Sequence, residues 1–68
     1  MSDFRLKVFY SVAKNLSFTK ASQELFVSQP AITKHIRELE SLYQTRLFNR
    51  LGNTISLTES GNVLLEHC

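Results

Sequence analysis

The chain has 68 residues, of which 43% are hydrophobic and 21% are charged, with a formal net charge of +2 and one cysteine. This length allows one small domain, in which a compact core leaves no material for a roomy catalytic cleft. The composition argues against disorder, the lone cysteine excludes an internal disulfide and fits a reducing compartment such as the cytoplasm, and no apolar run approaches the roughly 18 residues of a membrane span.

The first predicted helix runs from about Asp3 to Asn15. Its basic side chains lie largely away from an apolar stripe at helical spacing. Asp3 near the start and Lys14 near the end both suit the helix dipole. The stripe consists of Phe4, Val8, Phe9, Val12, Ala13 and Leu16.

A second, shorter helix is predicted from Phe18 to Leu25, with Ser17 as its N-cap. Small residues on its inner face, Ala21 and Ser22, let a crossing helix approach closely. Only Phe26-Val27 connects this helix to the next one. Because that turn contains no glycine, its backbone must bend without a residue that takes positive φ freely.

The third predicted helix follows Ser28, its N-cap, and extends to about Tyr43, with Pro30 in the first turn, where a missing N–H costs nothing. Lys34 and Arg37 lie on the face away from its apolar stripe. The stripe consists of Ile32, Ile36, Leu39 and Tyr43, and Leu42 is expected to pack at the end of the helix.

Two short helices joined this tightly, over residues 18–37, match the helix-turn-helix, whose second helix enters the major groove of DNA. The distribution of charge supports such a partner. Residues 1–37 carry six basic and two acidic side chains, a balance of +4, while residues 38–68 carry two basic and four acidic ones, a balance of −2. Basic charge near the two short helices suits a phosphate-rich partner.

Residues 47–57 are predicted to form a β-hairpin, with strands at 47–50 and 54–57 joined around Leu51-Gly52-Asn53. Glycine beside asparagine supplies the positive φ of a tight hairpin. Ile55 and Leu57 are expected to face inward. A hairpin after a helix-turn-helix is a wing, so residues 1–57 are predicted to form a mainly α, winged helix-turn-helix domain.

Thr58 is expected to cap a final helix over residues 58–68, with Glu59 in its first turn. The apolar pattern breaks off at Cys68, which indicates a domain excised from a longer protein. Gly61 inside this helix costs about 1 kcal/mol relative to alanine. We therefore expect a packing reason for Gly61, such as close contact with another helix.

Together these features resemble the N-terminal DNA-binding domain of LysR-type transcriptional regulators, a family of bacterial proteins. The resemblance covers nearly the whole chain. It implies a winged helix-turn-helix, a linker helix that pairs two protomers, and a C-terminal effector domain that is absent from this chain. The matching residues are Phe9, Val12-Ala13, Ser17-Phe18-Thr19, Ala21, Leu25, Val27-Ser28-Gln29-Pro30-Ala31, Thr33, Ile36, Leu39-Glu40, Leu47-Phe48, Arg50, Leu57-Thr58 and Gly61.

Two positions depart from the family pattern. Ser22 stands where a second alanine is usual, and Tyr43 stands where the recognition helix usually ends in glycine. Either Tyr43 takes a left-handed conformation at a cost of about 1 kcal/mol, or it stays helical and the helix ends one or two residues later. On this basis Tyr43→Gly is expected to be neutral or stabilising.

In a helix-turn-helix, residues early in the second helix meet base edges, where Gln pairs with adenine and Lys with guanine. The Pro30 ring suits a thymine methyl group, and the Ser28 hydroxyl with the free N–H groups at the helix start suits a phosphate. Wing residues are candidates for contacts with the DNA backbone. The predicted DNA-binding residues are Ser28, Gln29, Pro30, Thr33, Lys34, Arg37, Arg50 and Thr54.

Each candidate also has a purely structural interpretation. Lys34 and Arg37 could be ordinary solvated charges, and Gln29 with Pro30 could simply start a helix. Arg50 could pair with Glu40 or Glu59. His35 is expected to be a surface or half-buried neighbour of the apolar stripe.

The leading hypothesis is sequence-specific binding of double-stranded DNA for transcription regulation, as one arm of a homodimer formed through the linker helix. Eleven linker residues could be too few to hold two protomers together. The alternative is a winged-helix protein-interaction module without DNA binding. The sequence offers no catalytic set and no metal-ligand spacing, and it predicts no cofactor.

Overall fold

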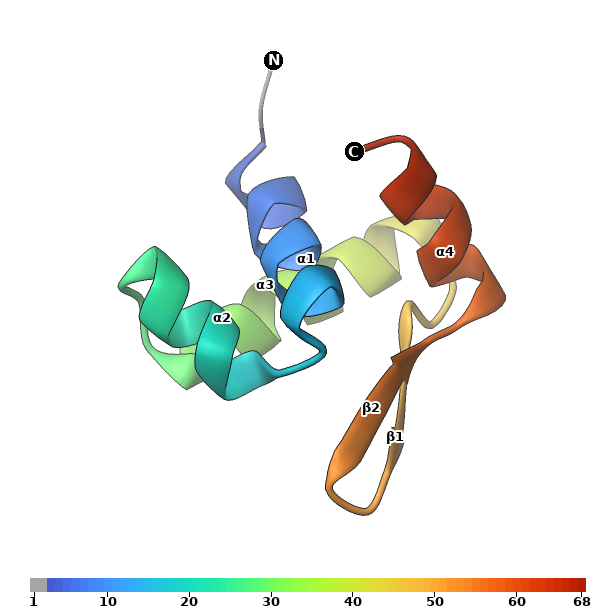
Figure 1. Ribbon diagram of the computed structural model, residues 1–68. Helices are drawn as coiled ribbons and strands as arrows, with labels where there is room; N and C mark the ends of the chain where they lie inside the picture. Colours follow the sequence, from blue (N-terminus) through green and yellow to red (C-terminus); the bar gives the residue numbers. More distant parts are fainter. Residues whose placement is uncertain (1–2) are drawn as a thin grey trace.

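The computed structural model describes residues 3–68, so residues 1 and 2 of the predicted domain lie outside the described part. Within it, helices α1 (Phe4–Asn15), α2 (Phe18–Leu25) and α3 (Gln29–Tyr43) precede strands β1 (Phe48–Leu51) and β2 (Thr54–Leu57), and α4 (Glu59–Glu66) follows (Figure 1). The strands form an antiparallel hairpin. The predicted mainly α, winged helix-turn-helix fold is confirmed.

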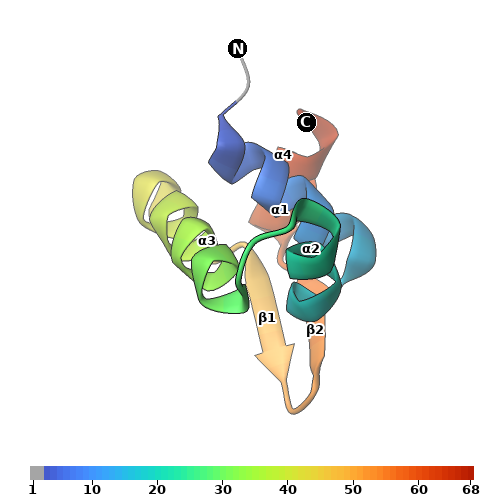
Figure 2. The same cartoon turned by 90° about the vertical axis from the view of Figure 1, so that its left-hand side faces the viewer.

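The three N-terminal helices surround one core, because α1 contacts both α2 and α3, and α2 contacts α3. The hairpin projects beyond them beside α3, away from the start of α1 and the end of α4 (Figures 1 and 2). None of the helices within residues 3–68 is long and apolar enough to cross a membrane. The core side chains are Val8, Phe9, Val12, Ala13, Ala21, Ile32, Ile36, Leu39, Leu47 and Phe48.

Four residues predicted to be buried or packed are instead substantially exposed. Phe4 is 43% exposed in the first turn of α1, at the edge of the bundle, and Leu16 is 48% exposed because it lies just beyond the end of that helix. Tyr43 and Leu42, in the last turn of α3, are 48% and 62% exposed. At these helix ends the predicted apolar stripes extend about one turn beyond the residues that the core buries.

Side-chain caps fix where the helices begin. The Ser17, Ser28 and Thr58 hydroxyls accept hydrogen bonds from the N–H groups of the third residue along, as N-caps do. The Asp3 carboxylate accepts from the Arg5 N–H, two residues along. Asp3 is therefore the cap of α1 and not its first helical residue, so α1 begins one residue later than predicted.

Three helices end in a left-handed residue that is not glycine: Leu16 after α1 (φ 49°), Phe26 after α2 (φ 58°) and Gln44 after α3 (φ 54°). The backbone N–H of each residue bonds back to its helix. Tyr43 itself is the last helical residue of α3. Of the two alternatives for Tyr43, the helical one is confirmed, and the expectation that Tyr43→Gly is neutral or stabilising loses its basis.

The hairpin turns more tightly than predicted. Strand β1 begins at Phe48, one residue late, and includes Leu51, which pairs with Thr54. Gly52-Asn53 is thus a two-residue loop with Gly52 at φ 60°, as a turn with glycine at its first central position requires. Ile55 and Leu57 are half-buried as predicted.

Aromatic rings join the hairpin to the helices. The Phe48 ring of β1 lies 5.4 Å from Phe9 of α1 and 6.1 Å from Phe18 of α2, measured between ring centroids. Edge-to-face and tilted pairs at these distances are favourable. The wing is therefore anchored in the main core.

Gly61 has the expected packing reason, but the neighbour is the hairpin and not a helix. A Cβ atom at Gly61 would meet the Leu47 carbonyl oxygen and approach the Leu57 side chain to 2.8 Å. The same Leu47 carbonyl accepts a hydrogen bond from the Thr58 N–H. The start of α4 is thereby pressed against the backbone at the base of the wing.

Candidate nucleic-acid interface

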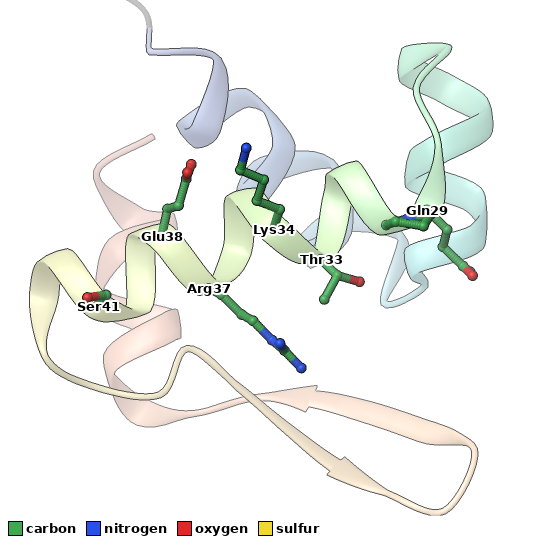
Figure 3. A pocket seen from close by; sticks show the side chains of 7 residues that line it. Gln29, Thr33, Lys34, Arg37, Glu38 and Ser41 are labelled. Atoms are coloured by element: carbon green, nitrogen blue, oxygen red, sulfur yellow. The ribbon is translucent and has the colours of Figure 1, made fainter.

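The outer face of α3 is an open, shallow depression that gathers most of the predicted DNA-binding residues. Four of them are exposed and Thr33 is half-buried. Two residues not predicted, Glu38 and Ser41, also line it (Figure 3). The predicted residues in the depression are Gln29, Pro30, Thr33, Lys34 and Arg37.

These side chains all lie on the outer face of α3, but they point in two different directions. Lys34 and Glu38 point to one side of α3, while Thr33 and Arg37 point to the other, and Arg37 reaches toward the hairpin (Figure 3). Consistently, Arg37 and Thr33 also line the hollow between α3 and the hairpin, whereas Lys34 does not. Lys34 and Arg37, which the sequence treats alike, therefore face different surroundings.

Gln29, the first residue of α3, is hydrogen-bonded to a residue of α2. The Gln29 side-chain amide donates a 2.6 Å hydrogen bond to the Thr19 hydroxyl. Gln29 keeps its amide oxygen and its second N–H for another partner. Thr19 was not predicted as a site residue, and no local signal indicates a contact ten residues away.

The start of α3 offers further donors. The Ser28 oxygen accepts from the Ala31 N–H at 3.3 Å, which leaves the hydroxyl proton of Ser28 available. With Pro30 in the first turn, the N-terminal end of α3 is well capped and carries the positive end of the helix dipole. Both features suit the predicted phosphate contact at this end.

On the wing, Arg50 does not adopt the ion pair considered from the sequence. Its guanidinium lies 4.2 Å from the centroid of the Phe18 ring, a cation–π arrangement. Among the described residues, the ion-pair partner of Glu40 is Arg46, at 3.9 Å, and no ion pair involves Arg50. Thr54 is exposed at the tip, where its hydroxyl donates to the Leu51 carbonyl at 2.8 Å.

Sequence reasoning missed Arg46. It lies in the short segment between α3 and β1 and lines the hollow beside Arg37 and Arg50. Because Arg46 lies outside the strand, no periodicity signals its position. His35 behaves as expected of a structural neighbour, with its ring edge-on to Phe4 at 5.4 Å and its Nδ1 atom 3.3 Å from Glu38.

Within residues 3–68 no group of three His, Cys, Asp or Glu side chains is placed to hold a metal ion. The depression on α3 presents an amide, hydroxyls and cations beside the Glu38 carboxylate. Such groups recognise base edges and phosphates.

Comparison with known proteins agrees with this geometry. Residues 4–62 match the family described as bacterial regulatory helix-turn-helix protein, lysR family. A probable RuBisCO transcriptional regulator of Thalassiosira pseudonana is 46% identical over 63 residues, which are 93% of this chain and 20% of that protein. The chain thus spans about one fifth of the length of such curated relatives.

Solved structures give the same result. The crystal structure of a CbnR_DBD–DNA complex superposes with a TM-score of 0.91 at 36% identity, covering 98% of this chain and 77% of that one. A BenM_DBD/catB site 1 DNA complex gives 0.91 at 28% identity, covering 98% and 74%. The chain belongs to the LysR family of bacterial regulatory helix-turn-helix proteins.

Proposed function

We propose that this chain binds double-stranded DNA sequence-specifically for transcription regulation, with α3 in the major groove. The observation that carries this proposal is the open depression on the outer face of α3, which the Gln29 amide, the Thr33 hydroxyl and the Lys34 ammonium line together. Two of the similar solved structures are complexes with DNA.

The predicted residues have distinct roles in this proposal. Gln29, Thr33 and Lys34 meet base edges, because they are the early residues of a recognition helix. Ser28 and the N–H groups at the start of α3 meet a phosphate. Arg50 and Thr54 contact the backbone beside the groove.

The domain boundaries follow from the same proposal. Residues 1–57 form the DNA-binding unit, and residues 58–68 begin a linker helix through which two copies pair. The chain acts by binding and not as an enzyme, with DNA in the cytoplasm as its partner.

The test is a titration of the 68-residue chain against two labelled duplexes at several salt concentrations. One duplex is selected from a random library by the protein, and the other has the same composition in scrambled order. Logarithmic affinity should fall linearly with logarithmic salt concentration, by roughly 0.9 per phosphate contact. The selected duplex should bind more tightly than the scrambled one.

Lys34→Ala supplies the residue-level test. If Lys34 reads guanine, preference at one base pair should relax by about 1–3 kcal/mol while the salt slope changes little. Absence of salt-dependent binding to either duplex would contradict the proposal. Salt-insensitive binding to a protein would support an interaction module instead.

A further inference from the structure

A hollow of about 340 Å³ separates α3 from the hairpin, and three arginines line it. They come from three different segments: Arg37 from α3, Arg46 from the connection after α3, and Arg50 from β1. A single carboxylate, Glu40, also lines the hollow. Three guanidinium groups and one carboxylate leave an excess of two positive charges.

The one carboxylate is already engaged. Glu40 is half-buried and accepts a hydrogen bond from the Leu47 backbone N–H at 2.9 Å. Its contact with the Arg46 Nε atom is long, at 3.9 Å, and the Arg46 side chain is 72% exposed. Glu40 therefore fixes the segment before β1 more than it neutralises the cluster.

Arg37 and Arg50 retain their hydrogen-bonding capacity. Within residues 3–68 neither guanidinium donates a hydrogen bond to another residue or forms an ion pair. Stacking on Phe18 orients the Arg50 fork and leaves its N–H edges free for a ligand in the plane of the group. Such forks match the oxygens of a phosphate, and anchoring one in advance lowers the entropy lost on binding.

The hollow is continuous with the exposed face of α3, because Thr33 and Arg37 line both. A DNA strand whose bases face α3 would pass its backbone toward the hairpin at this point. The ligand that the cluster suits is thus a phosphodiester of the same duplex that α3 reads.

We propose that the hollow between α3 and the hairpin seats one DNA phosphodiester, held jointly by Arg37, Arg46 and Arg50. This inference rests on the proposed DNA binding and refines it. It assigns Arg37 to the backbone, whereas Lys34, on the other side of α3, remains a reader of bases. Phe18 acts as a positioning residue for Arg50.

The first experiment compares Arg37→Gln, Arg46→Gln and Arg50→Gln with wild type on the selected and scrambled duplexes. Each variant should lose roughly tenfold in affinity for both duplexes equally. Because the three arginines share one phosphate, each single variant should lower the salt slope by less than the roughly 0.9 of a whole contact, and the triple variant should lower it by that full amount. Lys7→Gln, an exposed charge on α1, is the matched control and should change neither duplex as strongly. Thermal unfolding of each variant checks that the fold is kept.

The second experiment locates the phosphate. Single phosphates of the selected duplex are replaced, one at a time, by uncharged methylphosphonates. At one shared position the replacement should weaken wild type more than any of the three single variants, and it should cost the triple variant almost nothing further. Phe18→Leu, which keeps an apolar side chain without an aromatic face, should reduce the penalty of that replacement.

Three outcomes would overturn the proposal in distinguishable ways. Loss of affinity in Arg37→Gln for the selected duplex alone would make Arg37 a base reader. If all three variants bound with wild-type affinity, or if no shared phosphate position were found, the phosphodiester site between α3 and the hairpin would be disproved. The proposed DNA binding would still stand. Failure of wild type to bind either duplex would remove both.

Discussion

The Ser11 hydroxyl of α1 donates a 2.6 Å hydrogen bond to the carboxylate of Glu24 in α2. The Lys14 ammonium and the Asn15 amide donate to the same carboxylate at 3.2 and 3.3 Å. Ser11 is 2% exposed, so its hydroxyl depends on this partner. Three donors from the last turns of α1 thus converge on one side chain of α2. They fix the position of α2, which in turn supports the start of α3.

Ser11→Ala should lower the melting temperature by several degrees, because it removes a hydrogen bond in a buried setting while changing the volume little. The measurement is thermal unfolding followed by circular dichroism. Ser41→Ala, at an exposed position of α3, is the control and should leave the melting temperature unchanged or slightly higher. Equal melting temperatures for wild type and Ser11→Ala would show that the contact does not stabilise the fold.

The same contact makes stability depend on pH. The Ser11 hydroxyl first, and then Lys14, hold the pKa of Glu24 below its usual range. Because the pKa is lower in the folded than in the unfolded chain, the stabilisation is present above the unfolded pKa and is lost as pH falls through the folded one. Glu24→Gln should therefore melt below wild type near neutral pH, and the gap should close in acid. A gap that stays constant across the acid range would contradict this linkage.

Gly61→Ala should destabilise the domain although alanine favours helices, because the new methyl group would meet the Leu47 carbonyl oxygen. Gly61→Leu should cost more, in the range of about 1–3 kcal/mol or above for overpacked sites. Asn62→Ala, at the next and exposed position of α4, is the control and should be neutral or stabilising. Urea titration of the three variants measures the differences, and a stable Gly61→Leu would show that α4 shifts freely away from the hairpin.

Gln44→Gly should stabilise the domain by up to about 1 kcal/mol, because Gln44 is left-handed and glycine adopts that conformation without strain. Tyr43→Gly should act in the opposite direction by a similar amount, because Tyr43 is helical. Chemical unfolding of the two variants side by side decides the matter. If Tyr43→Gly proved the more stable, the left-handed residue would be misplaced by one position.

Thr19→Val should weaken recognition by Gln29 without unfolding the domain. The substitution keeps the shape of an exposed side chain but removes the hydroxyl that accepts from the Gln29 amide. We expect a smaller ratio of selected to scrambled affinity with an unchanged salt slope, because no phosphate contact is lost. Thr19→Ser, which retains a hydroxyl, is the control and should restore the ratio. An intact ratio in Thr19→Val would mean that Gln29 is oriented by the duplex alone.

Helix starts and strand faces could be predicted because their causes are local. Ser17, Ser28 and Thr58 cap the residues that immediately follow them, and the alternation around Ile55 is decided within one strand. The left-handed ends were predictable only in part, since an apolar residue such as Leu16 carries no signal for that conformation.

The site divides in the same way. The exposed face of α3 follows from helical periodicity, and most of the predicted residues lie there. The pairing of Gln29 with Thr19, the stacking of Arg50 on Phe18 and the approach of Arg46 each join segments that are distant in the chain. Such contacts depend on how the hairpin folds back beside α3, which no periodicity encodes.

The rings of Phe18, Phe48 and Phe9 form an unbroken path from the wing to the middle of the domain. A hairpin attached in this way cannot peel away while the helices stay packed, since Phe48 would have to leave the core with it. The amide protons that bond across its two strands should then exchange with solvent mainly when the whole domain opens. Although the hairpin projects from the helices, it should therefore unfold together with them in one cooperative transition.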